Sequence, residues 1–336
     1  MRLRKCNAAL LSLALAFLAA PAAAEPIKIG VVGVTAFAPV YVAQERGYFA
    51  AEGVPAELVY FDAAAPVAVA TVSGALDFGV SAVTAAFYNL AGQGELKIIA
   101  GAAHESPGFH IQAIMASKAA YAGGLKSIQD APHHSYAVTT RGAPPVYVLG
   151  GIIAPKYGFD FGSVTLLQLQ SLPNINTALE GGKADFTAQS LLPGMVPLID
   201  RGDIKLLGWV GDIAPWQFGL VFTSTKAADQ RHDTVERFLR AYRHGARDYH
   251  DAMTGPDGKP KGGAAADAMI DILAKYTKQT PADVKLSIPY IDAEGRLDVN
   301  DILHQVQFYK SQGVVKDTVD GQSLIDRRYV LPLSGS

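Results

Sequence analysis

Residues 74–78, Gly-Ala-Leu-Asp-Phe, are followed by Ser81, and the chain repeats this arrangement at 182–186, Gly-Lys-Ala-Asp-Phe, followed by Ser190. In each copy a glycine closes a helix-like segment and an aspartate occupies the turn. An apolar strand then delivers polar residues to its carboxyl end. Because the two copies occupy equivalent places in successive segments, they predict two similar lobes.

Short apolar strands alternate with helical stretches around the first copy, and the same alternation restarts around the second copy. This order predicts an α/β fold with mainly parallel sheets. An amphipathic helix with apolar residues from 235 to 249 follows, and Asn300 is expected to cap a last long helix. The remaining predicted elements are strands at 27–32, 56–60, 98–103, 136–140, 164–169, 204–210 and 218–223, and helices at 39–49, 144–157 and 175–179.

The first residues have the features of a secretory signal. Three basic residues precede an apolar run at 8–20, which is too short to span a bilayer, and three alanines at 22–24 precede Glu25. We therefore predict cleavage after Ala24 and a mature protein in the periplasm. The only cysteine, Cys6, precedes the apolar run, so we expect no lipid anchor, no disulfide and no cysteine nucleophile in the mature chain.

Charge and length limit the function classes. Removal of residues 1–24 takes away three of the 29 basic residues and leaves 26 against 31 acidic ones, a net charge of −5. A nucleic-acid partner would require a basic face, so we expect none. The 312 residues that remain of 336 are enough for two lobes with a large apolar core.

One longer segment resembles a known family. Residues 39–54, Pro-Val-Tyr-Val-Ala-Gln-Glu-Arg-Gly-Tyr-Phe-Ala-Ala-Glu-Gly-Val, are similar to the first helix and turn of the solute-binding proteins of nitrate, sulfonate and taurine ABC importers, with the thiamine-pyrimidine-precursor binders as close relatives. The segments 74–81, 141–143 and 298–313 support the resemblance. It implies a type II periplasmic-binding-protein fold, with two hinge-linked lobes that close on a ligand and no catalysis.

The resemblance also implies an organisation and a set of partners. Lobe one would comprise residues 27–112 plus 219–336, with the helical tail packed on it, and lobe two residues 113–218. Hinges would lie near 113–115 and 218–220. The expected partners are a small-molecule ligand and an ABC permease with its ATPase, and the protein is expected to act as a monomer without a cofactor.

Candidate site residues lie at strand ends, because ligands of open α/β sheets bind beyond the carboxyl ends of the strands. Two of them have a structural alternative, because Ser81 could instead be a helix cap and Trp216 could instead be a core residue. The candidates before residue 113 are Thr35, Phe37, Ala38, Ser81, Ala82, Thr84 and His104, and the later ones are Thr140, Arg141, Gly142, Ala143, Gln189, Ser190, Trp216 and Gln217.

The candidates suggest a class of ligand. Pro144 and Pro145 lack N–H groups, which weakens a backbone cradle for an anion. The planar guanidinium of Arg141 suits a carboxylate or sulfonate, and Phe37, Phe109 and Trp216 offer aromatic faces. We therefore expect an organic ligand with an apolar or aromatic body and an acidic or polar head, such as a sulfonate, a carboxylate or a pyrimidine.

Two other functions remain open. Fungal pyrimidine-precursor synthases look similar to these binders but share a cysteine-rich iron motif, and the mature chain has no cysteine. A periplasmic ligand sensor is the second alternative. A metal site is not expected, because His104 with His110, and His133 with His134, lack a third ligand.

Overall fold

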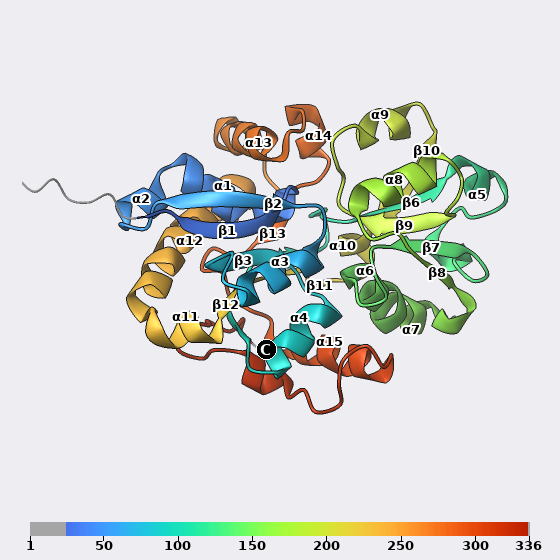
Figure 1. Ribbon diagram of the computed structural model, residues 1–336. Coiled ribbons are helices and arrows are strands. Elements are labelled where there is room, and N and C mark those ends of the chain that lie inside the picture. Colours follow the sequence, from blue (N-terminus) through green and yellow to red (C-terminus); the bar gives the residue numbers. More distant parts are fainter. Residues whose placement is uncertain (1–24, 335–336) are drawn as a thin grey trace, which may run out of the picture.

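The computed structural model describes residues 25–334, so the predicted signal peptide lies outside the described residues. The first of two five-stranded sheets has the strand order β2-β1-β3-β12-β4. It lies on the left in Figure 1. Its strands are β1 (Ile27–Val32), β2 (Ala56–Phe61), β3 (Phe78–Ala82), β4 (Leu96–Gly101) and β12 (Gly219–Ser224).

The second sheet lies on the right in Figure 1 and has the order β10-β6-β9-β7-β8. Its strands are β6 (Ala113–Ser117), β7 (Ser135–Val138), β8 (Thr165–Gln168), β9 (Phe186–Gln189) and β10 (Ile204–Trp209). A small third sheet, in the order β11-β5-β13, contains β5 (Ala103–Glu105), β11 (Trp216–Gln217) and β13 (Tyr290–Ile291). Both chain crossings between the large sheets therefore pass through or beside the third one.

The expectation of mainly parallel sheets is confirmed, with one reversed strand in each large sheet, so both sheets are mixed. Strand β12 runs antiparallel to β3 and β4, and β6 runs antiparallel to β9 and β10. Each of these two strands enters its sheet directly from the connection between the sheets, which reverses its direction. As a result, β6 and β12 begin at the edge where their parallel neighbours end.

The structure confirms that the repeated glycine-aspartate segments form the same turn. Asp77 accepts the N–H of Lys28 at 2.8 Å and donates its own N–H to the Lys28 carbonyl at 2.9 Å. Asp185 makes the same two bonds with Ser135, at 2.7 and 3.2 Å. Each aspartate thus fastens the start of its strand to the neighbouring parallel strand.

Helices cover the sheets, and most predicted helices are present with shifted ends. The predicted helix at 144–157 contains a π-helical segment at Val148–Ile153. The α-helices are α1 (Ala38–Glu45), α2 (Tyr48–Ala51), α3 (Ala64–Val72), α4 (Ala85–Gly92), α5 (Lys118–Ala122), α6 (Pro144–Tyr147), α7 (Ala154–Tyr157), α8 (Leu172–Glu180), α9 (Met195–Asp200), α10 (Val210–Ile213), α11 (Thr225–Gln230), α12 (His232–Met253), α13 (Ala264–Thr277), α14 (Pro281–Lys285) and α15 (Val299–Ser311).

The long helix α12 closes the core of the first sheet. The rings of Phe78 and Phe238 stack with centroids 3.9 Å apart. A Cβ atom at Gly245 would lie 2.2 Å from the carbonyl oxygen of Pro39, so only glycine lets α12 approach α1 this closely.

The last helix begins earlier than expected, since Asp298 rather than Asn300 caps it. The Asp298 carboxylate accepts the N–H of Asp301 at 3.0 Å, and its backbone is extended, so Asn300 lies inside the helix. Helix α15 packs against α4 beside the first sheet and also against α6 beside the second. It therefore touches elements of both sheets.

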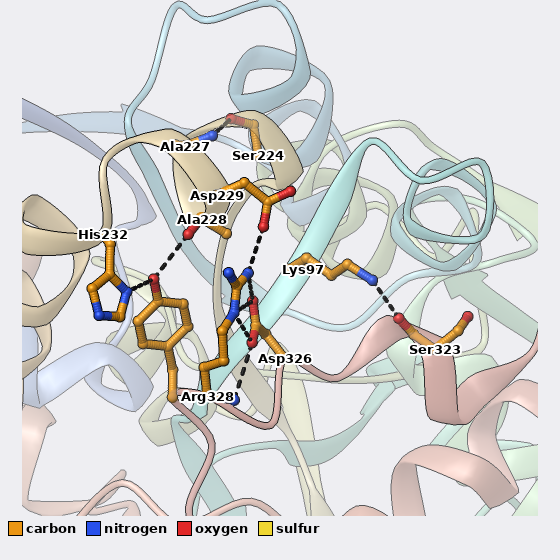
Figure 2. A network of polar contacts seen from close by, with 10 residues as sticks. Lys97, Ser224, Ala227, Ala228, Asp229, His232, Ser323, Asp326 and Arg328 are labelled. Atoms are coloured by element: carbon orange, nitrogen blue, oxygen red, sulfur yellow. Dashed lines mark hydrogen bonds and ion pairs between the residues drawn. The ribbon is translucent and has the colours of Figure 1, made fainter.

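The end of the described chain is tied back to the first sheet by a polar network (Figure 2). The guanidinium of Arg328 bonds to the carboxylates of Asp326 and Asp229, each at 2.6 Å from Nη2. Lys97 on β4 donates to the carbonyl of Ser323 at 2.6 Å. These bonds hold the C-terminal segment against β4 and α11.

Candidate ligand-binding site

A cavity lies between the two large sheets, at the edge where their parallel strands end. It contains about 580 Å³ of space, part of it open to solvent. The cavity is lined by Val32, Val34, Phe37, Ala63, Ala64, Ala82, Thr84, Gln112, Thr139, Pro144, Pro145, Leu172, Ile175, Ala188, Gln189, Ser190 and Phe218.

The wall on the side of the first sheet comes from the ends of three strands and from the segment before a fourth. Val34 and Phe37 follow β1, Ala63 follows β2, and Thr84 follows β3. Phe218 comes from the segment that leads into the reversed strand β12. Its ring stacks on that of Phe37, with centroids 6.3 Å apart, so the two rings form one aromatic surface.

The opposite wall repeats this plan in the second sheet. Thr139 follows β7, Leu172 follows β8, and Ser190 follows β9. Gln112 precedes the reversed strand β6, in the position that Phe218 holds before β12. The two sheets thus contribute to the cavity through corresponding elements.

The lining is apolar except for three hydroxyl and two amide side chains, those of Thr84, Thr139, Ser190, Gln112 and Gln189, and it contains no charged side chain. The rings of Pro144 and Pro145 occupy the first turn of α6, where other residues would present N–H groups. Such a surface suits an apolar body held by a few hydrogen bonds. It offers no cation to an anionic head.

Two amide oxygens of the lining have no hydrogen-bond partner. They are Oε1 of Gln112 and Oε1 of Gln189, and both side chains are only 2% exposed. The Gln112 amide nitrogen faces the carbonyl of Ala188 at 3.5 Å, so its oxygen points away from that strand. The Gln189 amide nitrogen contacts Asn176 and the sulfur of Met195.

Five sequence-predicted candidates line the cavity, namely Phe37, Ala82, Thr84, Gln189 and Ser190. Thr84 also caps α4, because its hydroxyl accepts the N–H of Phe87 at 3.1 Å. The other ten candidates lie outside the lining.

Four of those ten belong to the loop after β7. Arg141 is exposed and lines a separate surface hollow, and its backbone N–H donates to Oε1 of Gln168 at 3.1 Å. Thr140 lines a neighbouring hollow, which shares Ala63 and Thr139 with the cavity. The carbonyl of Gly142 accepts the N–H of Ala85 at 2.9 Å, and that of Ala143 accepts the hydroxyl of Tyr309 at 3.0 Å. Gly142 and Ala143 therefore contact elements beside the first sheet instead of the cavity.

Three further candidates lie behind the wall of the first sheet. The Thr35 hydroxyl is 3.2 Å from that of Ser287, and Ser81 bonds to the carbonyl of Ala82. Ala38 is fully buried at the start of α1. In the described structure, these residues support the wall rather than form it.

The last three lie in the third sheet. Trp216 packs edge-on against Phe218, with centroids 5.6 Å apart, one layer behind the cavity. Gln217 donates to the carbonyls of Ala103 and Gly219 and accepts the N–H of Asp298 at 3.0 Å. His104 packs edge-on against Tyr290, and burial lowers its pKa below the ordinary 6.5.

Two buried carboxyl groups lie close to the chain crossings. Burial raises the pKa of Glu105 well above its ordinary value, although its oxygens accept the N–H groups of Gln112 at 2.8 Å and Ile111 at 3.3 Å. Burial likewise raises the pKa of Asp301, which accepts the hydroxyl of Tyr147 at 2.6 Å and the N–H of Gln217 at 2.9 Å. Neither group lines the cavity.

Sequence reasoning missed several lining residues, above all Gln112 and Phe218. Both precede reversed strands, and the rule used for the prediction considers only the carboxyl ends of parallel strands. Their position next to the two predicted hinges was the available signal. Pro144 and Pro145 were considered only for the N–H groups that they lack.

Among residues 25–334, no group of three or more His, Cys, Asp or Glu side chains could hold a metal ion. Within the same part of the chain, no helix combines the length and apolar character needed to cross a membrane.

Two mixed sheets with a cavity across their facing edges define the type II periplasmic-binding-protein fold. The chain belongs to the NMT1/THI5-like family, whose sequence profile matches residues 34–257. No curated protein matches the sequence significantly.

Solved structures show the same fold at low sequence identity. The alkanesulfonate-binding protein SsuA from Xanthomonas axonopodis pv. citri, bound to MOPS, has a TM-score of 0.70 and 17% identity over 91% of this chain and 99% of its own. The periplasmic nitrate-binding protein NrtA from Synechocystis PCC 6803 has a TM-score of 0.65 and 14% identity over 89% and 84%. The Candida albicans CA3427 gene product has a TM-score of 0.65 and 16% identity over 92% and 98%.

Proposed function

We propose that the protein is the extracytoplasmic solute-binding component of an ABC importer and binds a small organic molecule between its two lobes. The observation that carries this proposal is the cavity, which is lined by corresponding strand ends of both large sheets. A ligand there contacts both sides at once. It therefore stabilises the arrangement in which the sides are close together.

We assign lobe one to residues 27–112 plus 219–336 and lobe two to 113–218. Hydrogen bonds across this division support a closed arrangement. Ala85 donates to the carbonyl of Gly142 at 2.9 Å, and Leu172 donates to that of Asp62 at 3.3 Å. Gln279 donates through its side chain to Leu191 at 2.7 Å. An opening motion would break these bonds. A ligand that contacts both lobes would add to them and favour the closed form.

Binding without catalysis fits the lining, because none of its side chains titrates near neutral pH or is an activated nucleophile. Transport also fits the structural relatives, among them the alkanesulfonate-binding and nitrate-binding proteins. The partners in this proposal are a membrane permease and its ATPase, which recognise the closed form. The compartment is the periplasm, reached through cleavage after Ala24.

A thermal-shift screen of purified residues 25–336 tests this function. The compounds are alkanesulfonates, nitrate, aromatic and aliphatic carboxylates, and pyrimidines. At a hundredfold excess over Kd, binding adds about 2.7 kcal/mol to the free energy of unfolding, and the midpoint rises by several degrees. X-ray scattering of the same samples should show ligand-dependent compaction. Scattering curves that are identical with and without a tight ligand would contradict the two-lobe mechanism.

A further inference from the structure

The sequence alone leaves open whether the ligand has an anionic head or an uncharged polar head. The lining of the cavity distinguishes these two kinds of ligand. An anionic head is bound through charge-assisted hydrogen bonds, so its site requires a cation or several N–H donors. The lining has no Lys, Arg or His side chain, and prolines fill the first turn of α6. Arg141, the candidate cation, is exposed in another hollow.

The two buried polar groups of the lining that remain unpaired are both acceptors. Gln112 is 2% exposed, and its Oε1 has no partner. The contact of its amide nitrogen with the Ala188 carbonyl at 3.5 Å favours this orientation, because the reversed amide would lose that bond. The backbone of Gln112 is also held, since its N–H donates to Glu105 at 2.8 Å and its carbonyl accepts from Val210 at 3.0 Å.

An unpaired buried carbonyl oxygen destabilises the folded protein unless a bound molecule donates a hydrogen bond to it. The molecule that completes this one must donate a hydrogen bond. We expect it to be uncharged, because no charged side chain of the lining compensates an anion, and largely apolar, because Phe37, Phe218, Pro144 and Pro145 form much of the wall.

We propose that the cavity selects an uncharged, mainly apolar molecule that carries an N–H or O–H donor, and that Gln112 is the residue that recognises this donor. Gln189, whose amide oxygen is also unpaired, offers a second acceptor. This inference rests on the proposed function and narrows its ligand class.

The test compares four probes with one phenyl body: benzamide, benzyl alcohol, benzoate and benzenesulfonate. Dissociation constants are measured by ligand-observed NMR at millimolar concentration. We expect the two uncharged donors to bind at least tenfold more tightly than the two anions. The matched variants are Gln112→Met, which keeps the side-chain length, and Gln307→Met, the same change on the exposed face of α15.

Gln112→Met should weaken benzamide about tenfold and raise the unfolding midpoint of the unliganded protein, because it removes an unpaired buried oxygen. If Gln112 had a purely structural role, the Gln112→Met substitution would lower the unfolding midpoint instead. Gln307→Met should change neither quantity.

Tighter binding of benzoate or benzenesulfonate overturns the ligand class and leaves the proposed function standing. Unchanged benzamide affinity in Gln112→Met overturns the role of that residue. If no probe binds, the ligand class is wrong, whereas the proposed function is decided separately by the broad screen and by scattering.

Discussion

Closure of the proposed lobes depends on a glycine contact that one methyl group can block. Gly142, in the loop after β7, lies against Ala85 at the start of α4, and its carbonyl accepts the Ala85 N–H at 2.9 Å. A Cβ atom at Gly142 would lie 2.5 Å from the Ala85 Cβ and 3.4 Å from its Cα. The φ angle of Gly142 is not positive, so alanine is compatible with the backbone there. Gly142→Ala therefore acts by bulk alone.

The structure sets the expected size of the effect. Carbon atoms in contact are normally about 3.5–4.0 Å apart, so the loop must withdraw by about 1 Å. Overpacking of this kind costs about 1–3 kcal/mol, and loss of the backbone hydrogen bond adds about 1 kcal/mol. Both costs fall on the closed form. Since 1.4 kcal/mol corresponds to a factor of ten, a ligand should bind Gly142→Ala about 30-fold to 700-fold more weakly.

Isothermal titration calorimetry with a ligand from the screen measures this loss, and scattering measures the reduced compaction. The double variant Gly142→Ala/Ala85→Gly removes the clashing methyl group and should recover most of the affinity. Gly262→Ala is the matched control, because a Cβ atom there meets nothing within 4 Å. Wild-type affinity and compaction in Gly142→Ala would refute the reasoning, as would failure of Ala85→Gly to rescue it.

Three further predictions concern charged and titratable groups. Arg141→Gln should change ligand affinity less than twofold in calorimetry, because Arg141 lies outside the cavity, and a tenfold loss would return it to the site. Burial lowers the pKa of His104 below its ordinary 6.5 in the folded state, so as the pH falls the unfolded chain takes up this proton first and the free energy of unfolding decreases below about pH 6.5. Urea unfolding between pH 7.5 and 5.5 should show a smaller decrease in His104→Gln, and equal slopes would contradict the burial argument. Asp326→Asn removes the carboxylate that Arg328 contacts at 2.6 Å and should lower the free energy of unfolding by about 1.5–3 kcal/mol, whereas Asp271→Asn on the exposed face of α13 should leave it unchanged.

Local sequence signals predicted much of the fold. The turn at Gly74 and Asp77 and its copy at Gly182 and Asp185 depend on a positive φ and on bonds to one neighbouring strand, so a few residues determine them. The capping residue of α15 was misassigned because Asp298 and Asn300 are both good caps, and only the backbone conformation distinguishes them.

Strand direction was not predictable in the same way. An apolar strand has the same pattern whichever way it runs, and the reversal of β6 and β12 depends on pairing with distant strands. The prediction therefore reached Phe37 and Ser190, which follow parallel strands, and missed Gln112. Arg141 was misleading because its sequence neighbours indicate a loop but not the direction in which its side chain leaves it.

The positions of Gln112 and Phe218 give the proposed motion a direct mechanical link. Each residue forms part of the cavity wall and also lies immediately before the strand that follows a crossing between the two sheets. In the proposed motion, a molecule pressed against both side chains would therefore act on the backbone that rotates when the lobes separate. In this proposal two residues of the cavity wall also lie at the hinges. Ligand binding in the cavity would therefore act on the hinges directly, without a conformational change elsewhere in the protein.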